Sequence, residues 1–117
     1  MREILFRGKR VDNGEWVYGS LYIWKEAKTS PYKKFRIGSF VESRMRHYEV
    51  DPSTVGQFTG LTDKNGKKIF ENGYMIIDNK TYKVIFDNAE YILTNIFNCD
   101  IITLKNNSIK GVFVDEI

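Results

Sequence analysis

The sequence predicts an all-β protein with at most one short helix. Most of its segments alternate apolar and polar residues, or stay apolar for roughly four to eight residues before a glycine, asparagine or aspartate. β-Branched and aromatic residues dominate these segments, and only 2 of the 117 residues are proline. Hydrophobic residues make up 42% of the chain, which suffices for one modest core and argues against disorder.

Ten segments have the composition of strands. They are residues 4–7, 15–24, 35–41, 48–50, 56–60, 74–78, 80–87, 91–93, 101–105 and 111–114. We expect one compact unit over residues 1–117, with an N-terminal β part (1–55) rich in hairpins and a C-terminal β part (56–117).

Short polar sequences between these strands predict tight turns. Asn13-Gly14 and Asn65-Gly66 supply residues that tolerate positive φ, and Asp78-Asn79 does so less well. The pair at 106–107, two asparagines, is predicted to close a hairpin between residues 101–105 and 109–114. Hairpins therefore account for most neighbouring strands.

Residues 87–100 allow two interpretations. Asp87 or Asn88 is a suitable N-cap, and apolar residues at 91, 92 and 96 fall at helical spacing. The same residues also suit a strand, which is the interpretation that we prefer, and the choice for Tyr91 to Ile96 stays open at this point.

The chain has one cysteine and one histidine, which cannot form an intramolecular disulfide or a zinc site. Cys99 stands among isoleucines and phenylalanine, so we expect a buried, unreactive thiol. His47 is flanked by charged residues, and we expect it at the surface. Neither residue suggests a catalytic centre.

No motif for a reaction is recognisable. The glycine-rich stretch 57–73 lacks the Lys-Ser/Thr of a phosphate loop and the Gly-x-Gly-x-x-Gly of a dinucleotide fold. The carboxylates are scattered, so we expect no catalytic residue, no cofactor and no metal. An enzyme that uses converging carboxylates is a less favoured alternative, and it would need two acids facing one pocket.

Positive charge is concentrated between residues 25 and 48. Seven lysines and arginines stand there against two glutamates, interleaved with aromatic residues, although the net charge of the whole chain is only +3. This mixture is used to neutralise phosphates and stack bases along single strands. The candidate nucleic-acid-binding residues are Lys25, Lys28, Tyr32, Lys33, Lys34, Phe35, Arg36, Arg44 and Arg46. The alternative is a polar loop between strands whose aromatic residues fill a core.

Two sequence blocks resemble the YopX family of small bacteriophage and prophage proteins. The blocks are ILFRGKRVDNGEWVYGSL at residues 4–21 and VDPSTVGQFTGLTDKNGKKIFE at residues 50–71. The resemblance implies a mostly β fold with a small SH3-like barrel in the C-terminal half, self-association, and no established activity. One departure follows Glu71, where the family usually has Gly-Asp-Ile-Val and this chain has Asn72-Gly73 before its next strand.

We therefore expect a non-enzymatic binding or interaction module that forms a homo-oligomer, with an unknown protein partner. The alternative is a nucleic-acid-binding module that uses segment 25–48. The chain has no apolar run of the roughly 20 residues that span a bilayer, and its N-terminus lacks the apolar core of a signal peptide. We expect no membrane association and a place in the cytoplasm of the bacterial host.

Overall fold

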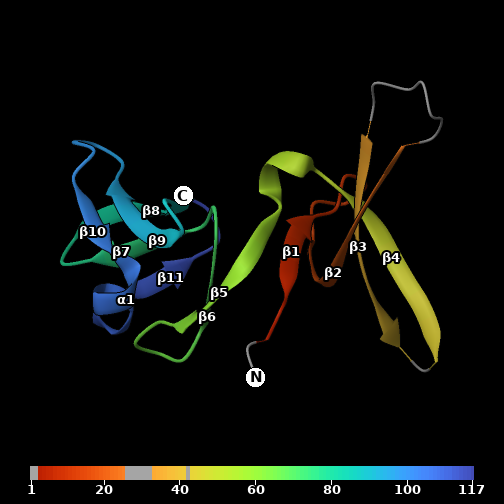
Figure 1. The fold of residues 1–117 in the computed structure, drawn as a ribbon, viewed down its shortest axis with the longest axis horizontal. Coiled ribbons are helices and arrows are strands. Elements are labelled where there is room, and N and C mark those ends of the chain that lie inside the picture. Colours follow the sequence, from red (N-terminus) through yellow and green to blue (C-terminus); the bar gives the residue numbers. More distant parts are fainter. Residues whose placement is uncertain (1–2, 26–32, 42) are drawn as a thin grey trace. The chain divides into compact units, whose positions relative to one another are not determined.

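A computed structural model describes residues 3–25, 33–41 and 43–117. The chain forms two compact units. The N-terminal unit comprises Ile4–Gln57, and the C-terminal unit comprises Phe58–Ile117 together with Glu3. Antiparallel strands form most of both units (Figure 1), which confirms the predicted fold class.

The N-terminal unit is built on four strands in the order β4-β3-β2-β1. Their bounds are β1 (Phe6–Lys9), β2 (Trp16–Lys25), β3 (Lys33–Val41) and β4 (Arg44–Val50). The predicted Asn13-Gly14 turn joins β1 to β2, with Gly14 at a φ of 73°. The Asn13 side-chain oxygen accepts the N–H of Glu15 at 3.0 Å, which fixes the turn.

The end of β4 returns to the end of β1. Val50 forms a bridge with Arg10, and the N–H of Asp51 donates to the carbonyl of Lys9 at 2.9 Å. This return buries Val50 and Ile37 at the centre of the unit. Gly8 allows the close packing, because a Cβ there would lie 3.0 Å from atoms of both side chains.

The Asp-Pro-Ser-Thr sequence at 51–54 forms a short 3₁₀ helix, η1 (Pro52–Thr54). Its N-cap is Asp51, whose carboxylate accepts the N–H of Ser53 at 3.0 Å. The hydroxyl of Thr54 accepts the N–H of Lys9 at 2.8 Å, so the helix is tied to β1. These residues belong to the second sequence block of the YopX resemblance, and their role in this structure is to stabilise the fold.

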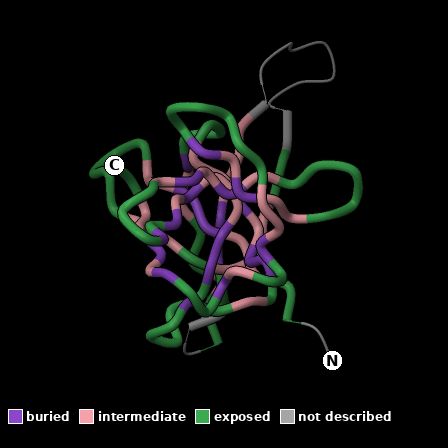
Figure 2. Tube along the Cα trace, turned by 90° about the vertical axis from the view of Figure 1, so that its left-hand side faces the viewer, coloured by how far each residue is buried: buried purple, intermediate pink, exposed green. Residues whose placement is uncertain are grey.

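The C-terminal unit contains the remaining elements. They are most of β5 (Gly56–Thr62), then β6 (Lys68–Phe70), β7 (Tyr74–Ile77), β8 (Lys80–Asp87), β9 (Glu90–Asn95), β10 (Ile101–Thr103), α1 (Leu104–Asn107), η2 (Ser108–Lys110) and β11 (Val112–Val114). Five of the strands form a sheet in the order β10-β9-β8-β7-β11. The fully buried side chains of the C-terminal unit include Ile69, Met75, Val84, Leu93 and Leu104, while the loops are exposed (Figure 2).

β9 settles the open choice in favour of the strand for residues 91–95, while Ile96 lies in the turn that follows. Two-residue turns flank β8 on both sides. Asp78 and Asn79 both have positive φ, which confirms the predicted turn before β8, and Asn88 and Ala89 do the same after it. Asn72 also has a φ of 71°, so an asparagine makes the positive-φ turn between β6 and β7.

The hairpin predicted around residues 106–107 is wrong. Both asparagines lie in α1, and β11 pairs with β7 instead of β10. Leu104 is fully buried, and the Asn107 side-chain amide donates to the carbonyl of Thr103 at 2.7 Å. The helical turn thus carries the chain from the β10 edge of the sheet to the opposite side. Because the strand order of both sheets is open, the barrel implied by the resemblance stays a prediction.

The Asn65-Gly66 turn joins β5 to β6, as predicted, and the buried carboxylate of Asp63 organises it. One oxygen, Oδ1, accepts the N–H groups of Asn65 at 2.8 Å and Lys67 at 2.9 Å. The other oxygen, Oδ2, accepts the N–H of Phe113 in β11 at 2.8 Å. Burial by itself raises the pKa of Asp63, but these three backbone donors outweigh it, and the pKa lies below its ordinary value.

Candidate binding surfaces

The structure divides the candidate nucleic-acid-binding residues. Lys28 and Tyr32 lie outside the described residues. Lys25 and Lys33 stand directly opposite each other at the paired ends of β2 and β3. The others occupy β3 and β4, where alternation of side chains places them on two faces of the sheet.

One face carries Lys34 and Arg36. Arg36 stands between Tyr22 of β2 and Glu49 of β4, and its Nη1 lies 3.4 Å from Nδ1 of His47. Tyr22 and His47 are exposed, as predicted for the histidine. This face, the Lys34/Arg36 face, therefore holds two of the predicted cations beside an exposed aromatic ring.

The opposite face carries Phe35, Arg44 and Arg46. Phe35 stands opposite the buried Val50. It therefore packs near the core and is poorly placed to stack on a nucleic-acid base. Arg44 and Arg46 are both exposed on β4. The positive charge that looks continuous in the sequence is thus distributed over two surfaces.

A small cavity opens in the N-terminal unit where β2 leaves β3. Its volume is about 250 Å³. We call it the aromatic slot, and its lining residues are Trp16, Val17, Tyr18, Ile37, Gly38, Ser39, Arg46 and Tyr48. Only Arg46 of these was a predicted site residue. Trp16 and Tyr18 lie in the predicted strand 15–24 and in the first block of the resemblance, but they were not predicted as site residues. The spacing Trp-x-Tyr on a strand is the signal that would have placed both on one face.

Arginine side chains lie over two of the slot's rings. The guanidinium of Arg7 lies 4.0 Å from the ring centroid of Trp16, and that of Arg10 lies 4.0 Å from the centroid of Tyr48. Arg10 also pairs with Asp12 at 2.6 Å, and this hydrogen bond holds the pKa of the Asp12 carboxyl below its ordinary value. Arg7 is itself buried.

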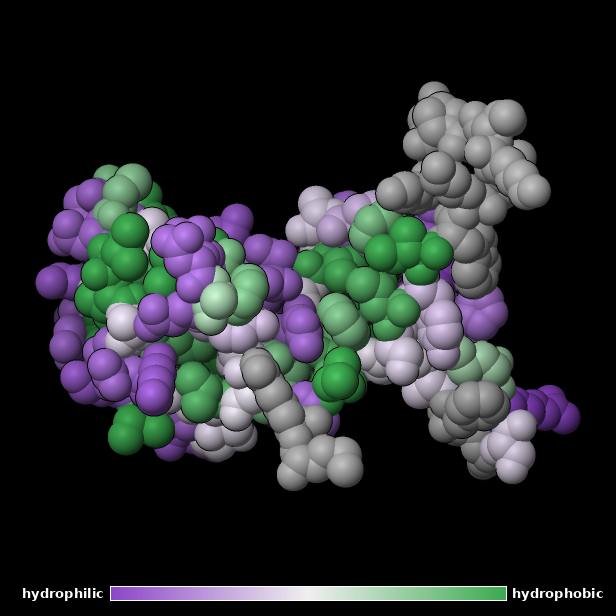
Figure 3. Space-filling view, viewed as in Figure 1, coloured by the Kyte–Doolittle hydropathy of each residue, from purple (hydrophilic) through white to green (hydrophobic). Residues whose placement is uncertain are grey.

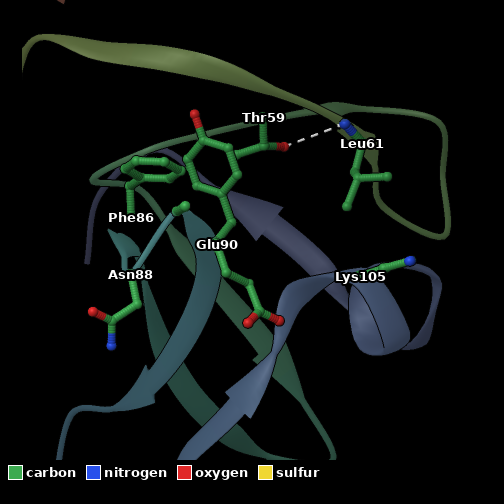
Figure 4. A pocket seen from close by; sticks show the side chains of 8 residues that line it. Thr59, Leu61, Phe86, Asn88, Glu90 and Lys105 are labelled. Carbon is green, nitrogen blue, oxygen red and sulfur yellow. Dashed lines mark hydrogen bonds between the residues drawn. The ribbon is translucent and has the colours of Figure 1, made fainter.

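A larger open groove of about 610 Å³ lies in the C-terminal unit (Figure 4). Its lining residues are Thr59, Leu61, Phe86, Asn88, Ala89, Glu90, Tyr91 and Lys105. The rings of Phe86 and Tyr91 lie 4.9 Å apart between centroids, and the amino group of Lys105 points away from Phe86 (Figure 4). Glu90 is the one carboxylate in the lining, so the groove does not bring two acids together. Sequence reasoning did not find this groove.

The part of β5 that lines the groove, at Thr59 and Leu61, contains a bulge. The pairing register between β5 and β6 shifts between Phe58 and Thr62. The hydroxyl of Thr59 donates to the carbonyl of Ile69 at 2.8 Å and accepts the N–H of Leu61 at 3.3 Å (Figure 4). This buried hydroxyl therefore replaces part of the interrupted ladder.

Exposed apolar side chains gather on the β9–β10 hairpin. Phe97 is 86% exposed and Ile101 is 63% exposed, and Ile96 beside them is also exposed. Figure 3 shows apolar surface over β10, which is the edge strand of its sheet. We call Ile96, Phe97 and Ile101 the hairpin cluster.

The expectation that Cys99 is buried is wrong, because it is exposed. Cys99 has a φ of 62° in the turn after β9, where its N–H donates to the carbonyl of Asn95 at 2.9 Å. The Asn95 side chain is buried instead and accepts the N–H groups of Phe97 and Asn98. A turn organised by asparagine thus turns the thiol outward.

Two carboxylates of this chain accept hydrogen bonds from backbone N–H groups at turns. Asp51 and Asp63 accept backbone N–H groups, as described above. Across the described ranges, no group of three or more His, Cys, Asp or Glu side chains is placed to hold a metal ion. No helix of these ranges has the length and apolar character needed to cross a membrane.

These features define a small antiparallel β protein whose candidate sites are two aromatic-lined cavities, a basic face and an exposed apolar hairpin. The chain belongs to the YopX family, whose model, described as YopX protein, matches residues 5–114. A comparison with curated proteins finds no match to the chain.

Proposed function

We propose that the chain is a non-enzymatic binding module that assembles with copies of itself through the β9–β10 hairpin. We also propose a bacteriophage or prophage origin and a place in the cytoplasm of the bacterial host. The observation that carries self-association is the hairpin cluster on an edge strand. An edge strand offers unpaired N–H and C=O groups, and exposed apolar side chains beside it add area that is stabilising to bury.

A second copy of the chain suits this surface because both of its components complement themselves. Edge strands pair antiparallel about a two-fold axis, and the apolar side chains of one copy then meet those of the other. The opposite edge of the sheet is not available in the same way. β11 there donates the N–H of Phe113 to Asp63, and the carbonyl of Gly111 accepts the N–H of Lys64.

We expect the chain to be an oligomer in solution. Light scattering after size exclusion at micromolar concentration is expected to give a multiple of the 13.7 kDa chain mass. Phe97→Ser is expected to weaken association at least tenfold, because it removes the one aromatic ring of the hairpin cluster, worth about 1.4 kcal/mol or more. Ile109→Ser is the control, because Ile109 is also a strongly exposed apolar residue, at 73%, but lies in η2. A monomeric parent protein would contradict the proposal.

A second candidate function is binding of single-stranded nucleic acid by the Lys34/Arg36 face. The observation that favours it is the exposed Tyr22 directly across from Arg36, with Lys34 on the same face. Cations neutralise phosphates and an exposed ring stacks on a base, and this pairing is typical of sequence-tolerant single-strand binding.

The second prediction tests this candidate by charge reversal. The parent protein is expected to bind a labelled single strand with micromolar affinity that falls steeply as salt is raised. The double variant Lys34→Glu/Arg36→Glu is expected to lose at least tenfold in affinity. Lys80→Glu/Lys83→Glu makes the same charge change on β8 and is expected to bind like the parent. Absence of binding even at low salt would end this candidate.

A further inference from the structure

We propose that the aromatic slot of the N-terminal unit is a binding site for one nucleotide unit of a single-stranded nucleic acid. The base would stack on the rings that line the slot, and the adjacent phosphate would pair with Arg46. This inference rests on the second candidate function, and it adds a site on β2 and β4 that the Lys34/Arg36 face does not include.

The slot is a consequence of how β2 divides its pairing. Residues 16–19 of β2 pair with β1, whereas residues 20–25 pair with β3. The strands cross closely at Gly19 and Gly38, where a Cβ on Gly19 would lie 2.3 Å from the Gly38 carbonyl oxygen. Beyond this crossing, β2 and β3 separate, and the slot lies between them with buried Ile37 among its lining residues.

The ring surfaces that line the slot are supported from outside it. Arg7 and Arg10 each lie over a ring that lines the slot, yet neither arginine belongs to the lining. Each guanidinium therefore covers one side of its ring. The ring surface of Trp16 and Tyr48 that the arginines leave uncovered lines the slot. A ring that already carries a cation on one side attracts a second cation poorly, whereas stacking of a neutral, electron-rich ring is still favourable.

The charge around the slot favours an anionic ligand. Arg46 is the one charged residue in the lining, and it is exposed. Lys9 adds a further cation, with its Nζ 6.0 Å from the Trp16 ring centroid. Two acids lie near Arg10: Asp12 pairs with it, and Glu15 also acts on it electrostatically. The cations at the slot and over its rings still outnumber these acids, and a guanidinium at the rim suits a phosphate.

The dimensions limit the ligand to one ring system. A volume of about 250 Å³ lies below the usual range for drug-sized ligands. The hydroxyls of Tyr18, Ser39 and Tyr48 supply polar groups for the edge of a base. A planar, electron-rich group with a phosphate attached can stack on the rings, fit the volume of the slot and pair with Arg46.

The test uses the full chain and the fluorescence of Trp16. The sequence has two tryptophans, so Trp24→Phe leaves Trp16 as the single reporter. A labelled oligothymidylate of about 10 nucleotides is added at low salt, within the site size of small β domains. Binding is expected to quench Trp16 to a saturating limit, with the same midpoint that anisotropy of the label gives.

Substitutions at two neighbouring arginines distinguish binding in the slot from a general effect of positive charge. Arg46→Glu is expected to lower affinity about tenfold and to reduce the salt dependence by about one ion. Arg44→Glu is the matched control, because Arg44 is exposed on the same face of β4 but does not line the slot. It is expected to lower affinity less than threefold. Both sites are exposed, so both variants should fold, and circular dichroism verifies that they do.

The outcomes distinguish the slot from the second candidate function. Quenching of Trp16 with a larger loss at Arg46 than at Arg44 supports the slot. Binding with equal losses at both arginines and no quenching overturns the slot and leaves the Lys34/Arg36 face as the binding surface. Absence of all binding overturns both. Quenching by an aromatic peptide but not by the oligonucleotide overturns the slot as a nucleotide site.

Discussion

Replacing Asp63 by asparagine is expected to lower the free energy of unfolding by about 3 kcal/mol at neutral pH. The carboxylate accepts three backbone N–H groups through both oxygens, and it is buried. An amide keeps one acceptor oxygen and places its own N–H₂ against at least one backbone donor. Urea denaturation of both proteins measures the difference.

The same substitution should remove a pH dependence. Because the folded-state pKa of Asp63 lies below the ordinary value of 3.8, the unfolded chain takes up this proton at the higher pH. The stabilisation is therefore complete above the ordinary value and is lost as the pH falls through the folded-state pKa. The difference between the parent and Asp63→Asn should stay constant from about pH 7 to about pH 5 and shrink as the pH falls below about 4.

Asp100→Asn provides the control for both measurements. Asp100 is an exposed carboxylate of the same unit, so its replacement should change the free energy of unfolding by less than about 0.5 kcal/mol. Equal effects at the two positions, or a difference at Asp63 that does not change with pH, would contradict the role assigned to Asp63.

Gly111→Ala is expected to lower the free energy of unfolding by about 3 kcal/mol. A Cβ at Gly111 would lie 2.3 Å from the carbonyl oxygen of Ile76 and 2.5 Å from a side-chain carbon of Ile77. The first of these is backbone, so relief requires β11 to move away from β7. Thermal unfolding followed by circular dichroism measures the loss.

Gly66→Ala separates this crowding from the general cost of replacing glycine. Gly66 has a φ of 80° with no atom within 4 Å of the added Cβ. Only the backbone conformation is unfavourable there, which costs about 1 kcal/mol. A loss at Gly111 no larger than the loss at Gly66 would show that β11 accommodates the methyl group.

Local chemistry predicted the turns well. Asn13-Gly14, Asn65-Gly66 and Asp78-Asn79 all form the expected connections, because positive φ is a property of a few residue types. The two asparagines at 106–107 failed for the opposite reason. Burial of Leu104 and the pairing of β11 with β7 depend on distant residues, which the local sequence does not encode.

The candidate surfaces were predicted less well. The sequence grouped Arg36 and Arg46 in one basic segment, and Arg46 lies outside the strands predicted at 35–41 and 48–50. The register between β3 and β4, in which Arg46 stands opposite Ser39, places it on the other face from Arg36. The aromatic slot could not be inferred from the sequence either. It requires Trp16 on β2 and Tyr48 on β4 to meet where β2 and β3 part, and that meeting depends on long-range register.

The link between Asp63 and Phe113 has a consequence for the order of folding. These residues are 50 positions apart, and β7, an interior strand, gains its second neighbour only from β11. On the ribosome, the consecutive hairpins β1–β2, β2–β3 and β3–β4 can pair from short separations as soon as they emerge. The C-terminal sheet can be completed only when β11 has been synthesised. During that interval β7 presents an open edge, so a nascent chain is most exposed to wrong pairing just before β11 is made.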